Sequence, residues 1–403
     1  MITLSRRSVL GGALAVCAAT QLPAKAQQQR LYVGTFAHLP VGLSPSAPEA
    51  SHSQGIYAFN LDGASGRTGP VVLAAPTLSP GNLILHSNRR VLYAGGAADT
   101  AIDGDCLISA FEIAGEQLQP LNSVRSGGSA PSHGVVDRRG RNLLTVNWSS
   151  GSLVCFALAA DGSLGQRTAF IGPGPIAAAP VPTTVPADPL ARPAEAAPQG
   201  RNKPHIVVLS PSEAFAIVAE IDADRCVVYR FHADQGTLIP HSTAESDPGA
   251  GPRHLAFHPN GQALYSSNET GSTVSAWRWD ERSGTLSLMQ SLPTTPAGTD
   301  AGNHPAHVAV HPSGRFVYVS NRGHGSIAVF RVGSGGRLES LPEAPLPSST
   351  CMCFAIDRSG HWLIAALETS GEVRIFSIDA ASGALSVTDQ RVPVSVPSCI
   401  QIA

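Results

Sequence analysis

Charged and aromatic side chains are scarce in this sequence of 403 residues. Charged residues make up 14% of the chain and aromatic residues 5%, and no acidic or basic block interrupts it. With a formal net charge of −2, the chain carries no patch that would attract a nucleic acid or an anionic membrane surface. Long stretches with an apolar period of 3.6 residues are also missing, which argues against a helical repeat.

The motifs of common metal and nucleophile sites are missing as well. We find no His-Glu-x-x-His, no paired Cys-x-x-Cys, no well-placed Gly-x-Ser-x-Gly elbow and no run of carboxylates suited to a hard cation. The sequence therefore predicts neither a metal nor another cofactor.

Six of the seven cysteines follow residue 26, and their spacing does not suit a metal: Cys106, Cys155, Cys226, Cys351, Cys353 and Cys399. Buried free thiols are the simpler interpretation. In an oxidising compartment, a bridge from Cys399 to Cys351 or Cys353 is the alternative. Lys203 is the one lysine after Lys25; it could reach a phosphate, but its solitude also fits a chain that otherwise uses arginine.

The N-terminus has the pattern of an export signal. Arg6 and Arg7 precede a short apolar run from Val9 to Thr20, and an Ala-x-Ala-like cleavage site ends at Ala26. The apolar run is too short to span a bilayer comfortably, and the bulk of Val16 disfavours lipidation at the next residue. We expect the twin-arginine export machinery to be a partner, residues 1–26 to be removed without leaving a membrane anchor, and the mature protein to be periplasmic or secreted. Removal of the signal takes the formal charge from −2 to −5.

One motif returns along the mature chain, and its clearest copy runs from Pro305 to Phe330. Alternating apolar residues, broken first by Pro312-Ser313-Gly314 and then by a glycine-rich turn, predict three antiparallel strands, and Arg337-Leu338-Glu339 begins a fourth. Equivalent strand openings occur at Asn82, His133, His205, His254, His307 and Cys353. Most of these spacings are near fifty residues, except where a Pro/Ala-rich insertion occupies about 172–199.

A seventh unit begins at Leu31-Tyr32-Val33 and lacks its first strand. The segment Val396–Ile402 has the pattern of an opening strand with nothing after it. We therefore predict an all-β, seven-bladed propeller of four-stranded antiparallel blades, with residues 27–403 as one domain. The C-terminal strand pairs into the first blade and closes the ring, which removes the open sheet edges.

Within a blade, the start of the first strand and the end of the second lie at the same edge. Neighbouring repeats should therefore gather polar side chains at one mouth of the propeller. We expect the following residues to bind substrate there: His133, Asn147, His254, Asn268, His307 and Asn321. Arg253, Glu269 and Arg322 differ from the corresponding residues of other repeats. Two arginines and a carboxylate on adjacent blades could bind an anion and move a proton, although a surface ion pair is the simpler alternative.

At these residues the chain resembles the lactonase family of seven-bladed propellers, which includes propeller-type 6-phosphogluconolactonases and a fungal carboxy-muconate lactonizing enzyme. The resemblance covers essentially the whole mature chain. It rests on an ordered set of motifs: Tyr32-Val33-Gly34-Thr35, Gly55-Ile56-Tyr57, Lys203-Pro204-His205, Gly251-Pro252-Arg253-His254, Asn268-Glu269, Asn321-Arg322-Gly323-His324 and the Cys399 strand. It implies a catalytic set of His205, Arg253, Glu269 and Arg322.

The family likeness implies a metal-independent lactonase for a small anionic lactone or carboxylate of sugar or aromatic origin. Two alternatives remain open, a muconate-type cycloisomerase and a non-catalytic binding propeller. The sequence departs from the family at Glu220-Ile221-Asp222, at Cys351-Met352-Cys353 and in its long insertion, which leaves the substrate open. Export also argues against 6-phosphogluconolactone, because that compound is cytoplasmic. A lactonase needs one concave, arginine-lined pocket, whereas a binding module would disperse its arginines over a broad face.

Overall fold

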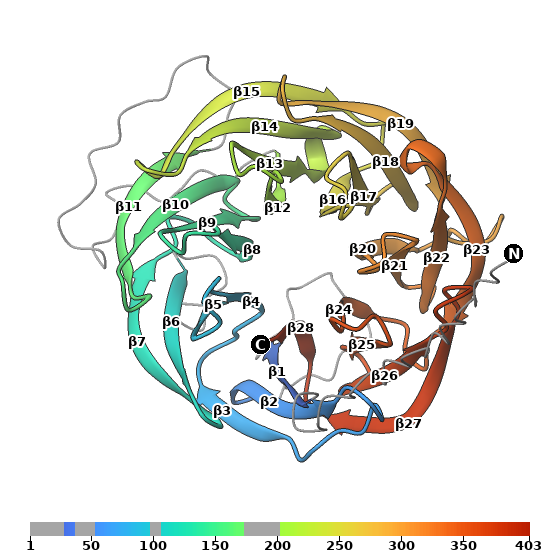
Figure 1. Ribbon diagram of the computed structural model, residues 1–403, viewed down its shortest axis with the longest axis horizontal. Helices are drawn as coiled ribbons and strands as arrows, with labels where there is room; N and C mark the ends of the chain where they lie inside the picture. The colour runs from blue at the N-terminus through green and yellow to red at the C-terminus, as the bar shows by residue number, and fades with distance from the viewer. Residues whose placement is uncertain (1–27, 37–52, 97–105, 173–201) are drawn as a thin grey trace, which may run out of the picture.

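The computed structural model describes residues 28–36, 53–96, 106–172 and 202–403. The predicted export signal at 1–26, and all but the first residue of the insertion at 172–199, lie outside the described residues. Seven four-stranded sheets stand around a central axis as the blades of a propeller (Figure 1). The predicted fold class is confirmed.

Of the first three blades, blade 1 alone combines both ends of the chain. Blade 1 contains β28 (Pro397–Ile402), β1 (Gln28–Thr35), β2 (Gly55–Asp62) and β3 (Val72–Pro76). Blade 2 contains β4 (Asn82–Leu85), β5 (Val91–Gly96), β6 (Leu107–Ala114) and β7 (Gln117–Arg125). Blade 3 contains β8 (Pro131–Val136), β9 (Asn142–Asn147), β10 (Ser152–Leu158) and β11 (Leu164–Ile171).

The remaining four blades follow in chain order. Blade 4 contains β12 (Pro204–Leu209), β13 (Phe215–Glu220), β14 (Arg225–His232) and β15 (Thr237–Glu245). Blade 5 contains β16 (Pro252–Phe257), β17 (Ala263–Asn268), β18 (Thr273–Asp280) and β19 (Thr285–Pro293). Blade 6 contains β20 (His304–Val310), β21 (Phe316–Arg322), β22 (Ser326–Val332) and β23 (Leu338–Pro345). Blade 7 contains β24 (Cys351–Ile356), β25 (Trp362–Leu367), β26 (Glu372–Ile378) and β27 (Leu385–Pro393).

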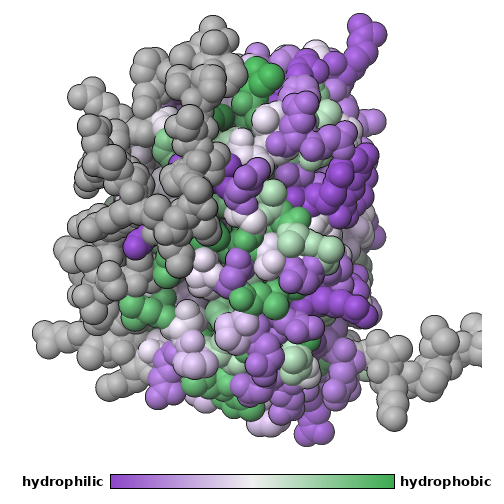
Figure 2. Space-filling view, turned by 90° about the vertical axis from the view of Figure 1, so that its left-hand side faces the viewer, coloured by the Kyte–Doolittle hydropathy of each residue, from purple (hydrophilic) through white to green (hydrophobic). Residues whose placement is uncertain are grey.

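The core lies between blades. Each of the seven clusters of buried apolar side chains combines residues from two neighbouring blades. The second strand β13 is therefore buried at every residue, whereas in the outermost strand β15 exposed positions alternate with buried or partly buried ones. Hydrophilic residues accordingly dominate much of the described surface seen in Figure 2, with smaller apolar islands between them.

The two ends of the chain complete the same blade. β28 pairs with β1 in an antiparallel register that places Leu31 opposite Ile402 and Val33 opposite Ile400. The amide of Ala403 also donates to the carbonyl of Arg30 at 2.8 Å. The predicted closing strand is thus confirmed, and it leaves the ring without an open seam.

All innermost strands except β4 carry a one-residue β-bulge, which decides which side chains of neighbouring blades lie at the same level. In blade 5, Pro252 pairs with Asn268 and His254 with Ser267, so Arg253 is the extra residue. In blade 4, Pro204 pairs with Glu220 and Ile206 with Ala219, so the extra residue is His205. The expected equivalence of His205 with His254 is therefore wrong by one residue: both blades carry the bulge, and His205 occupies the bulge position that Arg253 has in blade 5.

The bulged residues also connect neighbouring blades. Hydroxyls of Ser398 and Ser132 donate to the carbonyls of Gly81 and His205, at 3.0 and 2.9 Å. In the same way, Nη1 of Arg253 donates to the carbonyl of Ala306 at 3.1 Å. The bulge thus aims side chains into the channel and satisfies buried carbonyls of the next blade.

In the described part of the chain, helices are limited to two 3₁₀ turns, η2 (Ile221–Ala223) and η3 (Ser334–Gly336), and none is long or apolar enough to cross a membrane. The six described cysteines are free thiols, five of them buried, as the simpler interpretation expected. The side chains of Cys353 and Cys399 are nonetheless neighbours within hydrogen-bonding reach.

Candidate active site

A pocket of about 420 Å³ opens at one mouth of the channel. Its walls come from the first strands of the blades and from the ends of their second strands, and an apolar side includes Leu83, Val310, Phe354 and Ile356. The volume lies in the range of small-molecule sites. Of the predicted site residues, seven line this pocket: His133, His205, Arg253, His254, Glu269, His307 and Arg322.

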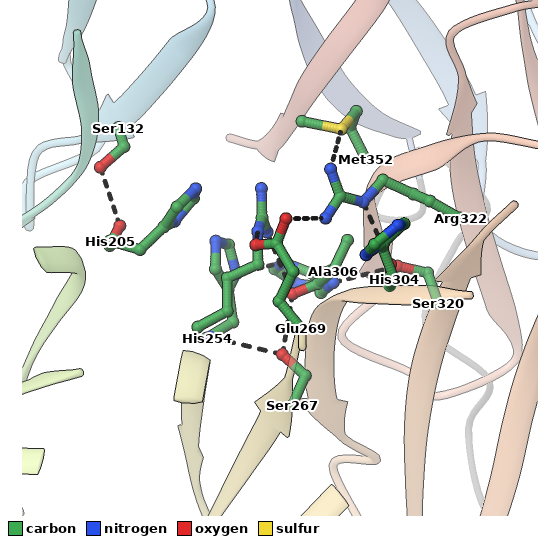
Figure 3. A network of polar contacts seen from close by, with 12 residues as sticks. Ser132, His205, His254, Ser267, Glu269, His304, Ala306, Ser320, Arg322 and Met352 are labelled. Carbon is green, nitrogen blue, oxygen red and sulfur yellow. Dashed lines mark hydrogen bonds and ion pairs between the residues drawn. The ribbon is translucent and has the colours of Figure 1, made fainter. Parts of the chain in front are cut away.

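Three charged side chains from two blades meet at the pocket wall. Arg253 comes from the bulge of β16, Glu269 directly follows β17, and Arg322 ends β21. Oε2 of Glu269 lies 2.9 Å from Nε of Arg253, and Oε1 lies 2.6 Å from Nη2 of Arg322. Figure 3 shows the Glu269 carboxylate reaching Arg322. One carboxylate therefore bridges two guanidiniums, whose side chains are 4% and 6% exposed.

Burial and charge act in opposite directions on this group of residues. Burial alone would raise the pKa of Glu269, but Arg322 and Arg253 together hold that pKa below its usual value. Burial also lowers the pKa of Arg253 to about 10, and the charge of Arg322 adds to this effect. Glu269 is therefore a carboxylate at neutral pH, and the three residues carry one net positive charge.

Further contacts hold both guanidiniums in place. Nε of Arg322 donates to the carbonyl of His304 at 3.1 Å, and Nη1 contacts Sδ of Met352 at 3.7 Å (Figure 3). Arg253 is anchored on the carbonyl of Ala306. Their donors are thus fixed before any ligand arrives, which is the arrangement that stabilises a developing negative charge most effectively.

Four imidazoles cross the channel beside the arginines. Ring centroids lie 5.1 Å apart for His205 and His254, 5.8 Å for His133 and His254, and 5.0 Å for His254 and His307. Nδ1 of His254 lies 3.0 Å from Nδ1 of His307, so one of these nitrogens carries the proton and the other accepts it.

These histidines are neutral at physiological pH. Burial lowers the pKa of His133 to about 4 and that of His307 to about 3. It also places the pKa values of His205 and His254 well below the usual range, and the charge of Arg253 depresses them further. Neutral imidazoles can accept protons, so His205 is suited to act as a base.

Several polar atoms of the wall lack a protein partner. Among the described residues, none hydrogen-bonds to Nδ1 of His133, Nδ1 of His205, Nε1 of Trp148 or Nδ2 of Asn82. All four residues line the pocket. Because buried polar atoms are normally satisfied, their presence on one wall points to a polar ligand or to water.

The three asparagines predicted to bind substrate lie elsewhere. Asn147, Asn268 and Asn321 are fully buried and outside the lining of the pocket. Their amide groups donate within the sheets, for example to Ser152, Ser275 and Ser326 at 2.9, 2.7 and 3.0 Å. These asparagines therefore hold the ends of the second strands together.

One acidic residue near the two arginines was not predicted from the sequence. Glu368 directly follows β25 of blade 7, as Glu269 follows β17, and it is 3% exposed. Burial raises its pKa to about 7, although Arg322 and Arg253 act in the opposite direction. Its position after a second strand was the available signal, but Leu367 replaces the asparagine that marks this place in other blades.

The structure also places the residues considered for other ligands. Lys203 pairs with Asp222 at 3.0 Å and lies over the ring of Trp148, and it does not line the pocket. Glu220 pairs with Arg225 at 2.7 Å. Across the described ranges, no group of three or more His, Cys, Asp or Glu residues is arranged to hold a metal ion.

Fold and site together define a class: a closed propeller with one polar pocket whose wall concentrates two guanidiniums, a carboxylate and neutral imidazoles. The family model for the seven-bladed β-propeller lactonases matches residues 30–402. The chain therefore belongs to the lactonase family of seven-bladed β-propellers.

Curated relatives agree with this assignment. The chain is 29% identical over 356 residues to the 6-phosphogluconolactonase of Bacillus subtilis (strain 168), covering 87% of this chain and 94% of the relative. It is also 29% identical over 349 residues to that of Yersinia pestis (strain Pestoides F), covering 85% and 92%. The chain is thus homologous to lactone hydrolases.

Solved structures share the fold. A protein from Lactobacillus plantarum superposes with a TM-score of 0.78 and 26% identity, covering 93% of this chain and 99% of that chain. The periplasmic gluconolactonase of Pseudomonas aeruginosa gives a TM-score of 0.76 and 24% identity, with the same coverage of both chains.

Proposed function

We propose that this protein hydrolyses a small lactone of sugar or aromatic origin in the pocket of Arg253, Glu269 and Arg322. The observation that carries the proposal is the pair of buried guanidiniums bridged by one carboxylate. In a lactonase-family chain, this pair lies where a substrate carbonyl can enter. The concentration of charge in one pocket also favours an enzyme over a binding module, which would spread its arginines over a broad face.

In the proposed mechanism, Arg253 and Arg322 donate hydrogen bonds to the carbonyl oxygen of the lactone. Attack by water turns that oxygen into an oxyanion, and the guanidiniums stabilise it more strongly than the neutral carbonyl. Preorganised donors of this kind contribute about 3–4 kcal/mol each. Glu269, held ionised by both arginines, keeps them aligned and limits their mutual repulsion.

His205 is the base of this mechanism. Its imidazole is neutral because burial and Arg253 depress its pKa, so it can take a proton from the attacking water. The bond between the carbonyl carbon and the ring oxygen then breaks. The imidazolium returns its proton to that ring oxygen, which leaves a hydroxy acid. The new carboxyl group releases its proton to solvent, and the resulting carboxylate lies against the arginines. The steps use only groups of this chain and water.

We further propose that the substrate carries no phosphate and that the enzyme acts after export. The twin-arginine pattern at Arg6 and Arg7 supports export. Lys203, the one lysine of the mature sequence, is paired with Asp222 rather than turned to the pocket. A muconate-type cyclization is the second candidate, since the same arginines could hold a carboxylate while His205 and Glu269 move the proton.

A lactone panel tests the proposal. The mature protein is assayed with sugar, aliphatic and aromatic lactones by acid release, and the spontaneous rate is subtracted. We expect hydrolysis of at least one sugar or aromatic lactone well above that rate. Absence of hydrolysis across the panel, with formation of lactone from a muconate, would replace the hydrolase proposal with the cyclase. Absence of both would favour a binding propeller.

A further inference from the structure

We propose that Glu368 is a proton-linked counter-ion of Arg253 and Arg322 that sets the net charge of the pocket and so makes its affinity for anions depend on pH. The inference rests on the proposed function, because the anion concerned is the carboxylate product of lactone hydrolysis. It assigns Glu368 a positioning role: the residue acts on the ligand through the arginines.

The place of Glu368 in the fold supports this role. In blades 5, 6 and 7, the first and second strands meet in one equivalent residue pair near the mouth. These pairs are Pro252–Asn268, Pro305–Asn321 and Cys351–Leu367, and the position of interest is the next residue after the second-strand member. The residues that occupy it are Glu269, Arg322 and Glu368. Three successive blades therefore carry a carboxylate, a guanidinium and a carboxyl group at equivalent positions, and Arg322 belongs to the middle blade.

Contacts of Arg322 bring blade 7 to this group. Its guanidinium rests on Met352, the bulged residue of β24. The neighbouring residue Cys351 pairs with Leu367, which directly precedes Glu368. Glu368 is 3% exposed and does not line the pocket, but it is near enough to Arg322 and Arg253 for their charges to act on its carboxyl group.

The charge of the pocket then has two states. With Glu368 protonated, two guanidiniums face the single carboxylate of Glu269, and the group carries one net positive charge. With Glu368 ionised, the charges balance. Because the pKa of Glu368 is raised by burial to about 7, the positive state prevails below that pH and is lost as the pH rises through it.

Apart from His304, the other titratable groups near the cluster keep the same charge near pH 7. Glu269 is held ionised by the arginines, and the thiol pKa of Cys351 is raised by burial to about 12. The depressed pKa values of His133, His205, His254 and His307 keep these residues neutral above about pH 5. His304, an exposed imidazole beside Glu269, requires its own control.

The test measures binding of D-gluconate by calorimetry across the neutral range in the wild-type protein, in Glu368→Gln and in His304→Gln. Glutamine reproduces the size and neutrality of a protonated glutamic acid, and thermal unfolding verifies that the variant folds. We expect wild-type affinity to fall about fivefold between about pH 6 and pH 8, because binding that raises a pKa of about 7 by one unit gives the full tenfold change only over a wider range. His304→Gln should show the same fall.

Glu368→Gln should keep the high affinity of the acidic form throughout, with a change of less than about twofold. The same fall in Glu368→Gln, a flat wild-type profile, or no wild-type binding at any pH would overturn the inference. These results are separate from the lactone panel. Gluconate binding with the expected pH profile but no hydrolysis would refute the hydrolase alone, and hydrolysis with identical profiles in both proteins would refute the role of Glu368 alone.

Discussion

In the proposed mechanism Glu269 aligns both arginines, and it stays ionised, so it has no proton to donate. Both of its oxygens contact guanidiniums, and these contacts outweigh the effect of burial on its pKa. The family likeness implied a catalytic set that contains both Glu269 and His205. The structure favours His205 for the proton transfer, because it is neutral, faces the pocket and has an unpaired Nδ1 among the described residues.

The base role of His205 predicts an unusual acid limb in the pH profile. Protonation of His205 removes the base, and its pKa lies well below the ordinary value of 6.5. We therefore expect kcat/KM for lactone hydrolysis not to decline as the pH falls through 6.5, and to decline only at more acidic pH. A stopped-flow measurement of acid release, corrected for the spontaneous rate, gives the midpoint.

The His205→Asn variant provides the control for this prediction. It should lose most of the activity at every pH and retain the wild-type unfolding temperature within a few degrees. A wild-type midpoint at or above 6.5, or a variant that keeps full activity, would assign the proton transfer to another group.

Single residues differed in how far sequence could predict them. Arg253, Glu269 and Arg322 were recognisable because they depart from what other repeats carry at the same place. Glu368 was missed because its environment, not its motif, makes it notable: its burial and its distance from the arginines depend on blade packing. The prediction that Asn147, Asn268 and Asn321 bind substrate was wrong for the opposite reason. A polar residue repeated at strand ends has the pattern of a binding site, but here its amide group makes hydrogen bonds within the sheet.

Elements were predicted well wherever the signal was local. Alternation and turn residues defined the strands, and the incomplete repeats at both ends predicted that β28 would join β1. Register was harder, because a bulge leaves the apolar pattern intact. His205 therefore appeared level with His254, whereas the pairing of Ile206 with Ala219 places it level with Arg253.

The closing strand predicts a stability effect. Ile400 in β28 is 4% exposed and belongs to the cluster between blades 1 and 7. Ile400→Ala should lower the free energy of unfolding by about 2–4 kcal/mol, because it removes buried methyl groups and leaves a cavity. Denaturant unfolding of the mature protein measures the change.

Val387 in β27 supplies the matched control, since it is an apolar residue of an outer strand that is 55% exposed. Val387→Ala should change the free energy of unfolding by less than about 0.5 kcal/mol. Equal effects of the two substitutions would show that the closing strand contributes no more to stability than the surface does.

For the whole molecule, the neutral histidine cluster links stability to pH. Because the pKa of each of the four imidazoles is depressed in the folded state, the unfolded chain takes up more protons below about pH 6.5, and stability falls with the pH. His254, whose pKa is lowered mainly by burial and further by the charge of Arg253, contributes to this loss of stability. Glu368 acts in the opposite direction, since its raised pKa costs stability as the pH rises from about 4.5 to 7.

The stability lost through the four histidines is larger than the stability gained through Glu368. We therefore expect the free energy of unfolding to fall by about 2–5 kcal/mol between about pH 7 and pH 5. Guanidinium unfolding at both pH values tests this. Replacement of His254 by glutamine should reduce the dependence by about one histidine's share. A protein equally stable at both values would show that these imidazoles are protonated in the folded state.

The pocket itself is a property of the whole ring. His205, Arg253, Glu269 and Arg322 line the same pocket although they are far apart in the sequence, because blades 4 to 6 are arranged around one axis. The repeat pattern alone predicted that these side chains would lie at one mouth of the propeller. The volume of the pocket, the double pairing of Glu269 and the neutrality of the histidines could not be predicted. They depend on distances between blades and on the exclusion of water, which no local pattern encodes.

The most direct test of the account is the rate of lactone hydrolysis in Arg322→Gln. Arg322 contacts Glu269 and Met352 from the end of β21, so its replacement removes one oxyanion donor and leaves the blade intact. We predict that kcat/KM falls about 100–1000-fold, mainly through kcat, with the β-sheet circular dichroism preserved. An Arg322→Gln protein that hydrolyses the best lactone of the panel at the wild-type rate would contradict the account.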